Sequence, residues 1–398
     1  MMVHKRDFVE QLFTDGVYEF DCAEKAPEWS VSASGDICFI HGVKDRIEAG
    51  NLETMFHGIS EILQADIVYG NLETPLTKRT EVNPAKKSGI RSEPEHFAAV
   101  ASLGFNLFCL GNNHVLDFQA GGLADTIKLL DEKDISHAGA GMNLAEARKP
   151  AFLNANGVKV GMISYCQPEA NAATETEAGV APLRSQLILE DLAQLKAQVD
   201  LPILSLHEGF EFGKAPRLEH KYRCHRYAEA GAKLIFSHHP HVPHGIEYHS
   251  DCLIFYSLGN FLFDYPYHRS HEWTRKNFVP RIFFSGTELK RLEIHPIELS
   301  AENELFRCRD EKKQYVLDYL KEISSYVLSD EKIESENRPI IERIMRGIMT
   351  SAFNHGKNNS KEEFDFFFNN VVTKCDPYMK ALRDFVKYQL EGESIADF

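Results

Sequence analysis

Short apolar runs alternate with amphipathic segments between about residue 30 and residue 300. The amphipathic segments repeat their apolar residues at helical spacing, and they predict helices over 122–133, 185–198 and 217–230. Most of the apolar runs are rich in Val, Ile or Phe, which is typical of strands. Strands that alternate with helices predict an α/β domain with a largely buried sheet. The predicted strands cover residues 31–40, 65–69, 105–110, 158–165, 202–206, 232–236 and 253–257.

The pattern changes near residue 300. The segments beyond it are charged on one side and apolar on the other, so they predict helices over 312–328, 332–349 and 361–390. Residues 1–30 show no clear period. The Phe-rich stretch Phe364–Phe368 is expected in a helix core, with an exposed patch as the alternative. We therefore expect an N-terminal arm over 1–30, an α/β domain over 31–299 and a helical C-terminal extension over 300–398.

Polar side chains follow five of the predicted strands, at the point where each strand ends. In open α/β sheets, ligands gather outside the carboxyl ends of the strands, so we expect these side chains to lie close together. Asp, Glu, Asn and His are also the ligand types of a divalent transition-metal site with mixed nitrogen and oxygen donors. The strand-end residues are Asp36, Glu73, Asn112, Asn113, His114, His207, His238, His239 and His241.

Histidines are concentrated in one part of the chain. Eight of the 18 histidines lie between residues 207 and 249, and three of them stand together around Pro240. A lone histidine in a loop is usually only solvated, so His4, His57, His96 and His355 receive no role. Within the concentrated region, four of the eight histidines are also not expected to be ligands. Those four are His220, His225, His244 and His249.

Composition narrows the classes of function. The chain has 59 acidic and 44 basic residues and a net charge of −15, which disfavours broad binding to nucleic acid or anionic lipid. A small anionic substrate held by metal ions is still compatible with this charge. The chain lacks a run of about 18 apolar residues that could span a membrane and the apolar core of a signal peptide. Its eight scattered cysteines are typical of a reducing compartment, so we expect a cytoplasmic protein.

Six short motifs stand in the order found in one known family. Over about residues 31–265, the chain resembles the CapA family of capsule and poly-γ-glutamate biosynthesis proteins, which are related to the calcineurin-like metallophosphoesterases. The resemblance implies a metallophosphoesterase-like layered sheet core flanked by helices. The motifs are Gly35–Asp36, Asn71–Leu76, Asn112–Asp117, Leu206–Glu211, His239–Val242 and Tyr256–Phe261.

The same resemblance implies a site for two divalent metal ions, with Mn, Fe or Zn as the expected metals. It assigns Glu73 as the ligand that bridges the two metals and His114 as the acid–base histidine, with Asp117 of the same motif as a second catalytic residue. Pro240 would stiffen the turn between two histidine ligands. The implied ligands are Asp36, Glu73, Asn113, His207, His239 and His241. The implied substrate-binding or supporting residues are Asn71, Asn112, His41, Glu208, Glu211, His238 and Asn260.

Some of these residues allow a simpler interpretation, and some depart from the family. Gly35–Asp36 could be only a turn, and Glu73 could only begin a helix or turn. Glu208 stands where relatives carry an aromatic residue, and His41 stands where they commonly carry Arg. Cys38 occupies the place of a frequent histidine, and it could be a thiolate ligand or, as we favour, a buried apolar residue.

Two classes of function follow from the resemblance. The first is a metal-dependent hydrolase or transferase that acts at a phosphoryl or related centre in capsule, poly-γ-glutamate or surface-polysaccharide biosynthesis. Its substrate would be anionic or a polymer precursor, and polymer-synthesis proteins would be its partners. The alternative is a non-catalytic accessory subunit of a polymer synthase. A full set of metal ligands favours the enzyme, because a binding module would not need one.

Overall fold

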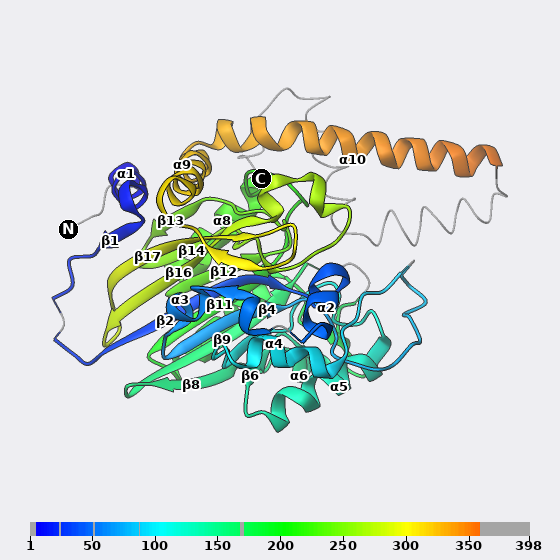
Figure 1. Ribbon diagram of the computed structural model, residues 1–398, viewed down its shortest axis with the longest axis horizontal. Helices are drawn as coiled ribbons and strands as arrows, with labels where there is room; N and C mark the ends of the chain where they lie inside the picture. Colours follow the sequence, from blue (N-terminus) through cyan, green and yellow to red (C-terminus); the bar gives the residue numbers. More distant parts are fainter. Residues whose placement is uncertain (1–4, 24, 51, 87, 168–170, 359–398) are drawn as a thin grey trace.

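The computed structural model describes residues 5–358 apart from residues 24, 51, 87 and 168–170. Two β-sheets pack face to face, and helices cover their outer faces (Figure 1). The predicted α/β core of layered sheet and flanking helices is therefore confirmed. It contains two large sheets, whereas the pattern of apolar runs indicated one.

The first sheet has a parallel part and an antiparallel part. Strands β2, β4, β5 and β6 pair in parallel, and β16 joins the other side of β2 as one arm of an antiparallel hairpin with β17. Strand β1 (Val17–Glu19) pairs with β17, and β15 (Asn260–Leu262) pairs with β2. The strand order is β3 (Phe56–His57), β18 (Leu305–Arg307), β17 (Glu288–Leu299), β16 (Lys276–Ser285), β2 (Glu28–Ile37), β4 (Ile67–Leu72), β5 (Leu107–Cys109) and β6 (Ser136–Ala138).

The second sheet is parallel in its centre and antiparallel at both edges. Its order is β13 (Ile246–His249), β14 (Cys252–Phe255), β12 (Leu234–His238), β11 (Leu201–His207), β9 (Val158–Cys166) and β8 (Ala151–Ala155). A separate short pair joins β7 (Ala140–Gly141) to β10 (Gly179–Val180).

The main core lies between the two sheets. Val31 and Tyr69 of the first sheet share it with Ile203 and Phe236 of the second, and all four side chains are buried. The Tyr69 and Phe236 rings stack with their centroids 4.8 Å apart. Burying an apolar side chain of this size contributes roughly 1.5–3 kcal/mol, so these cross-sheet contacts hold the sheets together.

Amphipathic helices close the outer faces of the sheets. Ile188, Leu192 and Leu195 of α7 stand at helical spacing and are all buried against the second sheet, as the sequence pattern predicts. Helices α2 (His41–Glu48), α3 (Ile59–Leu63), α4 (Ala98–Ala101) and α5 (Gln119–Glu132) cover the first sheet. Helices α6 (Leu144–Ala147), α7 (Ser185–Lys196) and α8 (Leu218–Glu229) cover the second.

The first helix of the described chain packs side by side with a helix near its C-terminal end (Figure 1). They are α1 (Lys5–Asp15) and α9 (Asp310–Tyr326), and both contribute buried apolar residues to the main core. Helix α10 (Asp330–Asn358) follows α9 and extends along the outside of the molecule. None of the helices in the described part of the chain is long and apolar enough to cross a membrane.

All seven predicted strands and five of the six predicted helices correspond to elements of the structure, with boundaries shifted by a few residues. The sixth helix, over 361–390, and Phe364–Phe368 lie outside the described residues. The boundaries at residues 30 and 300 stay predictions. The structure adds that α1 lies within the predicted arm and that β18 precedes the helices of the predicted extension.

Candidate metal centre

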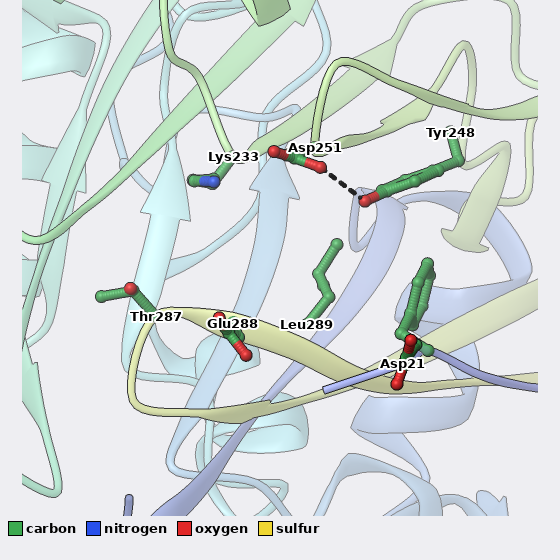
Figure 2. A pocket seen from close by; sticks show the side chains of 8 residues that line it. Asp21, Lys233, Tyr248, Asp251, Thr287, Glu288 and Leu289 are labelled. Carbon is green, nitrogen blue, oxygen red and sulfur yellow. Dashed lines mark hydrogen bonds between the residues drawn. The ribbon is translucent and has the colours of Figure 1, made fainter. Parts of the chain in front are cut away.

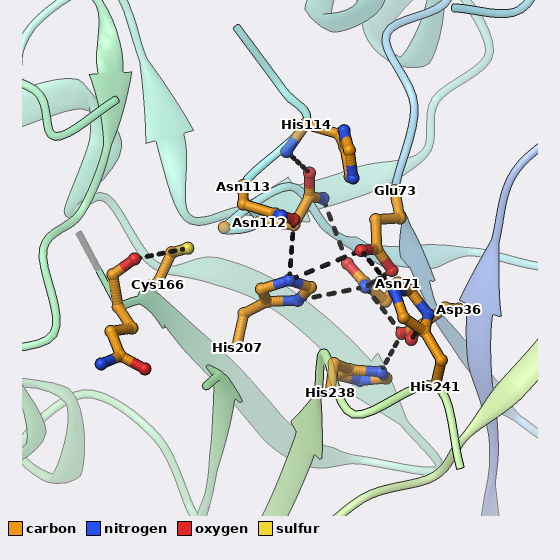
Figure 3. A network of polar contacts seen from close by, with 12 residues as sticks. Asp36, Asn71, Glu73, Asn112, Asn113, His114, Cys166, His207, His238 and His241 are labelled. Atoms are coloured by element: carbon orange, nitrogen blue, oxygen red, sulfur yellow. Dashed lines mark hydrogen bonds and ion pairs between the residues drawn. The ribbon is translucent and has the colours of Figure 1, made fainter. Parts of the chain in front are cut away.

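The carboxyl ends of strands from both sheets bring the predicted ligands together (Figure 3). In the first sheet, Asp36 of β2 lies in register with Asn71 of β4 on one side and with Asn260 of β15 on the other. In the second sheet, His207 at the end of β11 lies in register with His238 at the end of β12. The site therefore lies where the two sheets meet, and each sheet supplies part of it.

Two local backbone features place these residues. A side chain at Gly35 would put its Cβ only 2.0 Å from the carbonyl oxygen of Gly259, so only glycine lets β15 approach the end of β2 this closely. On either side of Pro240, His239 and His241 have φ angles of 98° and 59°. Residues other than glycine rarely adopt this backbone conformation, and such strain is concentrated at functional sites.

The first group of possible ligands is Glu73, His207 and His239. Each residue offers one ligand atom, these atoms all lie within 4.8 Å of one another, and all three residues are buried. The Oδ1 of Asn113 lies 3.0 Å from Nε2 of His207, which places Asn113 beside this group. Two imidazoles, a carboxylate and an amide oxygen are suitable donors for a divalent transition metal.

The second group is Asp36, Glu73 and His241, which meets the same distance limit and is also buried. Oδ2 of Asp36 lies 3.2 Å from Nδ1 of His241, and Oε1 of Glu73 lies 3.8 Å from Nε2 of His241. Glu73 is common to both groups, as expected for a carboxylate that bridges two metals.

Unpaired polar atoms in this cluster fit bound cations. Oε1 of Glu73 and Nδ1 of His239 are buried and have no hydrogen-bond partner among the described residues. Buried polar atoms are normally paired, because leaving one unpaired costs free energy. Two such atoms from two predicted ligands therefore indicate positions where metal ions would complete the coordination.

The electrostatics of the cluster lead to the same interpretation. Burial raises the pKa of Glu73 well above its usual range, and the nearby charge of Asp36 raises it further. Burial would also raise the pKa of Asp36, but hydrogen bonds from His238 and His241 bring it well below its usual range. Burial and the neighbouring His239 lower the pKa of His207, which keeps this imidazole neutral and able to bind a metal.

Four supporting residues orient the possible ligands. Nδ2 of Asn71 donates to Oδ1 of Asp36 at 2.9 Å, and Nδ2 of Asn112 donates to Oδ1 of Asn71 at 3.2 Å. Nδ1 of His238 lies 2.8 Å from Oδ1 of Asp36, and Nδ1 of His241 lies 3.0 Å from Oδ1 of Asn260. Such contacts set the orientation of metal ligands and tune their basicity.

His114 lies beside the ligands and is held by a carboxylate. Its Nδ1 is 2.8 Å from Oδ2 of Asp117, and its side chain is 23% exposed. The Nζ of Lys86 lies 3.0 Å from Oδ1 of Asp117 and donates to the backbone oxygen of Asn113 at 2.5 Å. Burial would raise the pKa of Asp117, but the hydrogen bond from His114 and the charges of His114 and Lys86 lower it, so Asp117 is ionised.

Two of the predicted supporting residues lie apart from the ligand network, and a third acts on it through its charge. His41 is exposed at the start of α2, and its ring lies 5.3 Å from that of Tyr265. The carboxylate of Glu208 is buried and pairs with Arg223 of α8. Glu211 is exposed, and its charge opposes the lowering of the His239 pKa by burial. Their functional roles stay predictions.

Cys38 is buried, and burial raises its pKa well above the usual range, so it is a thiol. It packs in a small apolar cluster with Ile40 and Phe263, which agrees with the apolar role that the sequence favours.

Sequence reasoning missed three residues that contact this centre. Lys86 holds Asp117, the Tyr69 hydroxyl lies 2.7 Å from Nε2 of His238, and the ring of His268 lies 4.5 Å from that of His241. None of the three follows a predicted strand, so no strand-end pattern marked them.

Comparisons with known proteins show the family to which this chain belongs. A family model described as "Bacterial capsule synthesis protein PGA_cap" matches residues 30–265. The "Capsule biosynthesis protein CapA" of Bacillus anthracis is 30% identical over 251 residues, which cover 61% of this chain and 60% of that protein. The "PGA biosynthesis protein CapA" of Bacillus subtilis is 28% identical over 275 residues, which cover 68% of this chain and 71% of that protein. A "Probable polyglutamine synthesis accessory protein" of Mycobacterium tuberculosis is 31% identical over 227 residues, which cover 54% of this chain and 60% of that protein.

Solved structures give weaker similarity. A 5'-nucleotidase precursor from Thermus thermophilus aligns with a TM-score of 0.41 and 13% identity, over 75% of this chain and 60% of that one. A hypothetical protein from the same organism aligns with a TM-score of 0.41 and 13% identity, over 68% of this chain and 99% of that one. At these TM-scores the similarity carries no inference, so the description of the site rests on its own geometry.

Proposed function

The chain belongs to the family of bacterial capsule synthesis proteins, and from this membership we propose that it is a divalent-metal-dependent hydrolase or transferase. It acts at a phosphoryl or related centre of an anionic or polymer-precursor substrate during synthesis of a capsule, poly-γ-glutamate or a surface polysaccharide. The observation that carries the proposal is Glu73, which belongs to two buried groups of ligands at once.

The two groups define which residues would hold each ion. Glu73, Asn113, His207 and His239 would hold one, and Asp36, Glu73 and His241 would hold the other. When bound, two such cations polarise the electrophile and lower the pKa of a bound water.

His114 is assigned the transfer of a proton to the leaving group. Because Asp117 is ionised and accepts the Nδ1–H of His114, it fixes the tautomer and leaves Nε2 as the nitrogen that exchanges protons. Lys86 holds the second oxygen of Asp117 and so keeps the carboxylate in this orientation. A positioned histidine of this kind contributes roughly two to four decades of rate.

The second candidate is a non-catalytic accessory subunit of a polymer synthase. It is favoured by the name of the Mycobacterium tuberculosis relative, a "Probable polyglutamine synthesis accessory protein". Under this proposal the buried site would hold metal for structural reasons, and partners from the synthase would bind elsewhere on the chain.

Metal analysis combined with an assay on a chromogenic phosphodiester separates these proposals. The purified protein, loaded with Mn²⁺, is expected to hold about two ions per chain and to hydrolyse the ester. His239→Ala should lose at least one ion and the activity, whereas His137→Ala, a matched change at a partly exposed histidine that contacts Asp131, should lose neither. Full metal occupancy in both Asp36→Ala and His239→Ala would contradict the assignment of the site. Two bound ions without hydrolysis of any phosphoester would favour the accessory role.

We also propose that the protein works in the cytoplasm. The seven cysteines in the described part of the chain are thiols, and six of them are buried, which is typical of proteins in a reducing compartment. Cell fractionation tests this, and recovery with the membranes or outside the cell would contradict it.

A further inference from the structure

A cavity of about 300 Å³, here called the Arg91 cavity, lies beside the candidate metal centre. Its walls come from the start of α2, from residues 89–93 and from Phe118. The backbone N–H of Ile90 donates to Oδ2 of Asp117 at 2.9 Å, and the same oxygen lies 2.8 Å from Nδ1 of His114. The cavity therefore shares a wall with the residues that hold the proposed proton donor.

Arg91 lines this cavity with one edge of its guanidinium group unpaired. Nη1 donates to the backbone oxygen of Thr77 at 2.8 Å and to Oε1 of Glu93 at 2.6 Å. Neither Nε nor Nη2 of Arg91 has a hydrogen-bond partner among the described residues. The side chain is 27% exposed, so a ligand can reach it. The contacts of Nη1 thus fix the group and leave its other edge for a ligand.

The unpaired edge of Arg91 suits an oxyanion. Nε and Nη2 of an arginine bind a carboxylate or a phosphate through two parallel hydrogen bonds. The chain contains an example, because Arg148 binds Asp191 through Nε at 2.8 Å and through Nη2 at 2.6 Å. The edge that Arg148 uses for Asp191 is the edge that Arg91 keeps unpaired.

Lys44 of α2 brings a second positive charge to the cavity. It pairs with Glu48 one turn along the helix at 3.6 Å, and the two side chains are 44% and 50% exposed. An exposed pair at this spacing contributes little to stability, so the ammonium group can turn to a ligand at small cost. The cavity therefore combines a fixed guanidinium edge with a movable ammonium group.

The charge of its lining distinguishes the Arg91 cavity from a cavity of about 400 Å³ near β13 (Figure 2). The described lining of that second cavity has three carboxylates and one ammonium group, so it repels an anion. These four residues are Asp21, Asp251, Glu288 and Lys233. In the described lining of the Arg91 cavity, Lys44 and Arg91 face a single carboxylate, Glu93, which already pairs with Arg91. The Arg91 cavity is therefore the better site for an anion.

A row of side-chain rings joins the candidate metal centre to this cavity. The ring of the candidate ligand His241 lies 4.5 Å from that of His268, which lies 5.6 Å from that of Tyr265. The Tyr265 ring lies 5.3 Å from that of His41, which lines the cavity at the start of α2. An extended molecule that lies along these rings contacts the centre at one end and the cavity at the other.

We propose that the Arg91 cavity binds a second anionic group of the substrate, a carboxylate or a phosphate, at a distance from the reacting centre. The inference rests on the proposed function for the substrate, whereas the cavity and its charges do not depend on that function. Nε and Nη2 of Arg91 bind the anion, and the Lys44 ammonium approaches it from α2. The two residues thereby select a substrate that carries repeated negative charges, such as a segment of an anionic polymer.

The test measures the binding of two oligoanions, tripolyphosphate and tetraglutamate, to full-length proteins by NMR titration at low ionic strength. Metal ions are removed beforehand with EDTA, and the EDTA is then dialysed away, so that bound cations hold neither probe. The four proteins are the wild type, Arg91→Lys, Lys44→Met and the matched control Lys128→Met. Lys128 is an exposed lysine that pairs with Glu132 one turn along α5 at 3.7 Å, as Lys44 pairs with Glu48.

Arg91→Lys keeps the charge but loses the edge with two nitrogens. Its affinity for at least one probe is expected to fall roughly tenfold or more. Lys44→Met should bind the same probe roughly two- to fivefold more weakly than the wild type, and Lys128→Met should match the wild type. A loss confined to tripolyphosphate identifies the anionic group as a phosphate, and a loss confined to tetraglutamate identifies it as a carboxylate.

Three results overturn the proposal. They are the absence of binding of either probe to the wild type, equal affinity of the wild type and Arg91→Lys for both probes, and equal affinity of Lys44→Met and Lys128→Met. Far-ultraviolet circular dichroism verifies that every variant is folded, and Lys44 is exposed enough that its substitution leaves the core intact. Since neither metal nor hydrolysis enters the measurement, failure of the proposed hydrolase activity does not alter its result.

Discussion

Nδ1 of His238 lies 2.8 Å from Oδ1 of Asp36, and this contact joins the second sheet to the first inside the candidate metal centre. His238 also reaches the Tyr69 hydroxyl through Nε2, at 2.7 Å. The imidazole therefore donates Nδ1–H to a predicted ligand while the hydroxyl of Tyr69 fixes its other nitrogen. His238 is placed to orient Asp36 rather than to bind a metal itself.

The first prediction follows from this contact. His238→Leu removes the donor, and metal affinity is expected to fall by roughly 10–100-fold, the usual effect of losing a residue that orients a ligand. His238→Asn keeps an N–H near the position of Nδ1 and should restore most of the affinity. Isothermal titration with Mn²⁺ measures both variants, and an equal loss in the two would mean that His238 acts only through packing.

The second prediction concerns unequal affinity of the two proposed ions. The group with Asn113, His207 and His239 provides four ligands including Glu73, whereas the group with Asp36 and His241 provides three. Graded chelation should therefore remove one ion before the other. In Asn113→Ala the difference should shrink, because both groups then have three ligands. Loss of both ions at a single chelator concentration in the wild type would contradict this assignment.

The third prediction separates binding from proton transfer. His114→Asn should keep the bound metal but lose roughly two to four decades of rate on a phosphodiester. Lys86→Met should give a smaller loss, because Asp117 keeps its contacts with His114 and with the backbone N–H of Ile90. Metal analysis and steady-state kinetics give the answer. Loss of metal in His114→Asn would make His114 a ligand, and an unchanged rate would remove it from the mechanism.

The grouping of the strand-end residues could be predicted because parallel strands end at the same edge. Their role as metal ligands stays a prediction, based on the few residue types that bind transition metals. Asp36, Glu73 and His207 followed from this reasoning and from the family motifs. Lys86 could not be found in the same way, because it lies in a polar loop and reaches Asp117 only through the fold. Glu208 was expected beside the ligands, but its carboxylate pairs with Arg223, a choice that depends on side-chain packing.

The fold, too, could be predicted from the sequence only in part. The buried parallel strands were predicted because they are nearly continuous apolar runs. The antiparallel pair β16 and β17 was missed, since half-buried positions such as Arg281 and Lys290 interrupt its apolar residues. The presence of two sheets depends on contacts such as Tyr69 with Phe236, which link residues far apart in sequence.

The fourth prediction concerns acid stability. Burial would raise the pKa of Asp264, but hydrogen bonds and charges from Arg269 and Arg275 lower it. A lowered pKa in the folded state means that ionised Asp264 stabilises the protein above its unfolded pKa near 3.8. This contribution is lost as the pH falls from that value through the lower folded pKa.

Asp264→Asn should therefore lower the free energy of unfolding at pH 6 and also flatten its decline below pH 4. The matched control is Asp318→Asn, at an exposed position of α9 whose carboxylate accepts from the exposed Gln314, and it should change little. Urea unfolding at a series of pH values measures both variants. An equally steep decline in Asp264→Asn and the wild type would contradict the role given to this carboxylate.

The last prediction concerns the C-terminal helices and the loop after β11. Phe210 of this loop packs with Ile341 and Met345 of α10, and Nδ2 of Asn337 donates to the backbone oxygen of Pro216 at 2.8 Å. The same loop carries Phe212, whose ring centroid lies 6.4 Å from that of His241. Helix α10 therefore supports a loop that borders the candidate metal centre.

Two truncations distinguish the contributions of α9 and α10. A chain that ends at residue 300 lacks the buried Leu317 and Leu320 of α9, so it should aggregate through the core surface that these residues cover. A chain that ends at residue 329 keeps α9 and should stay soluble with full metal content, but its ester hydrolysis should fall because the loop loses its support. Ile341→Asp should reproduce this loss within the full-length chain, and Arg346→Ser, at an exposed position of the same helix, should not. Full activity in both the chain ending at 329 and Ile341→Asp would mean that α10 has no part in shaping the site.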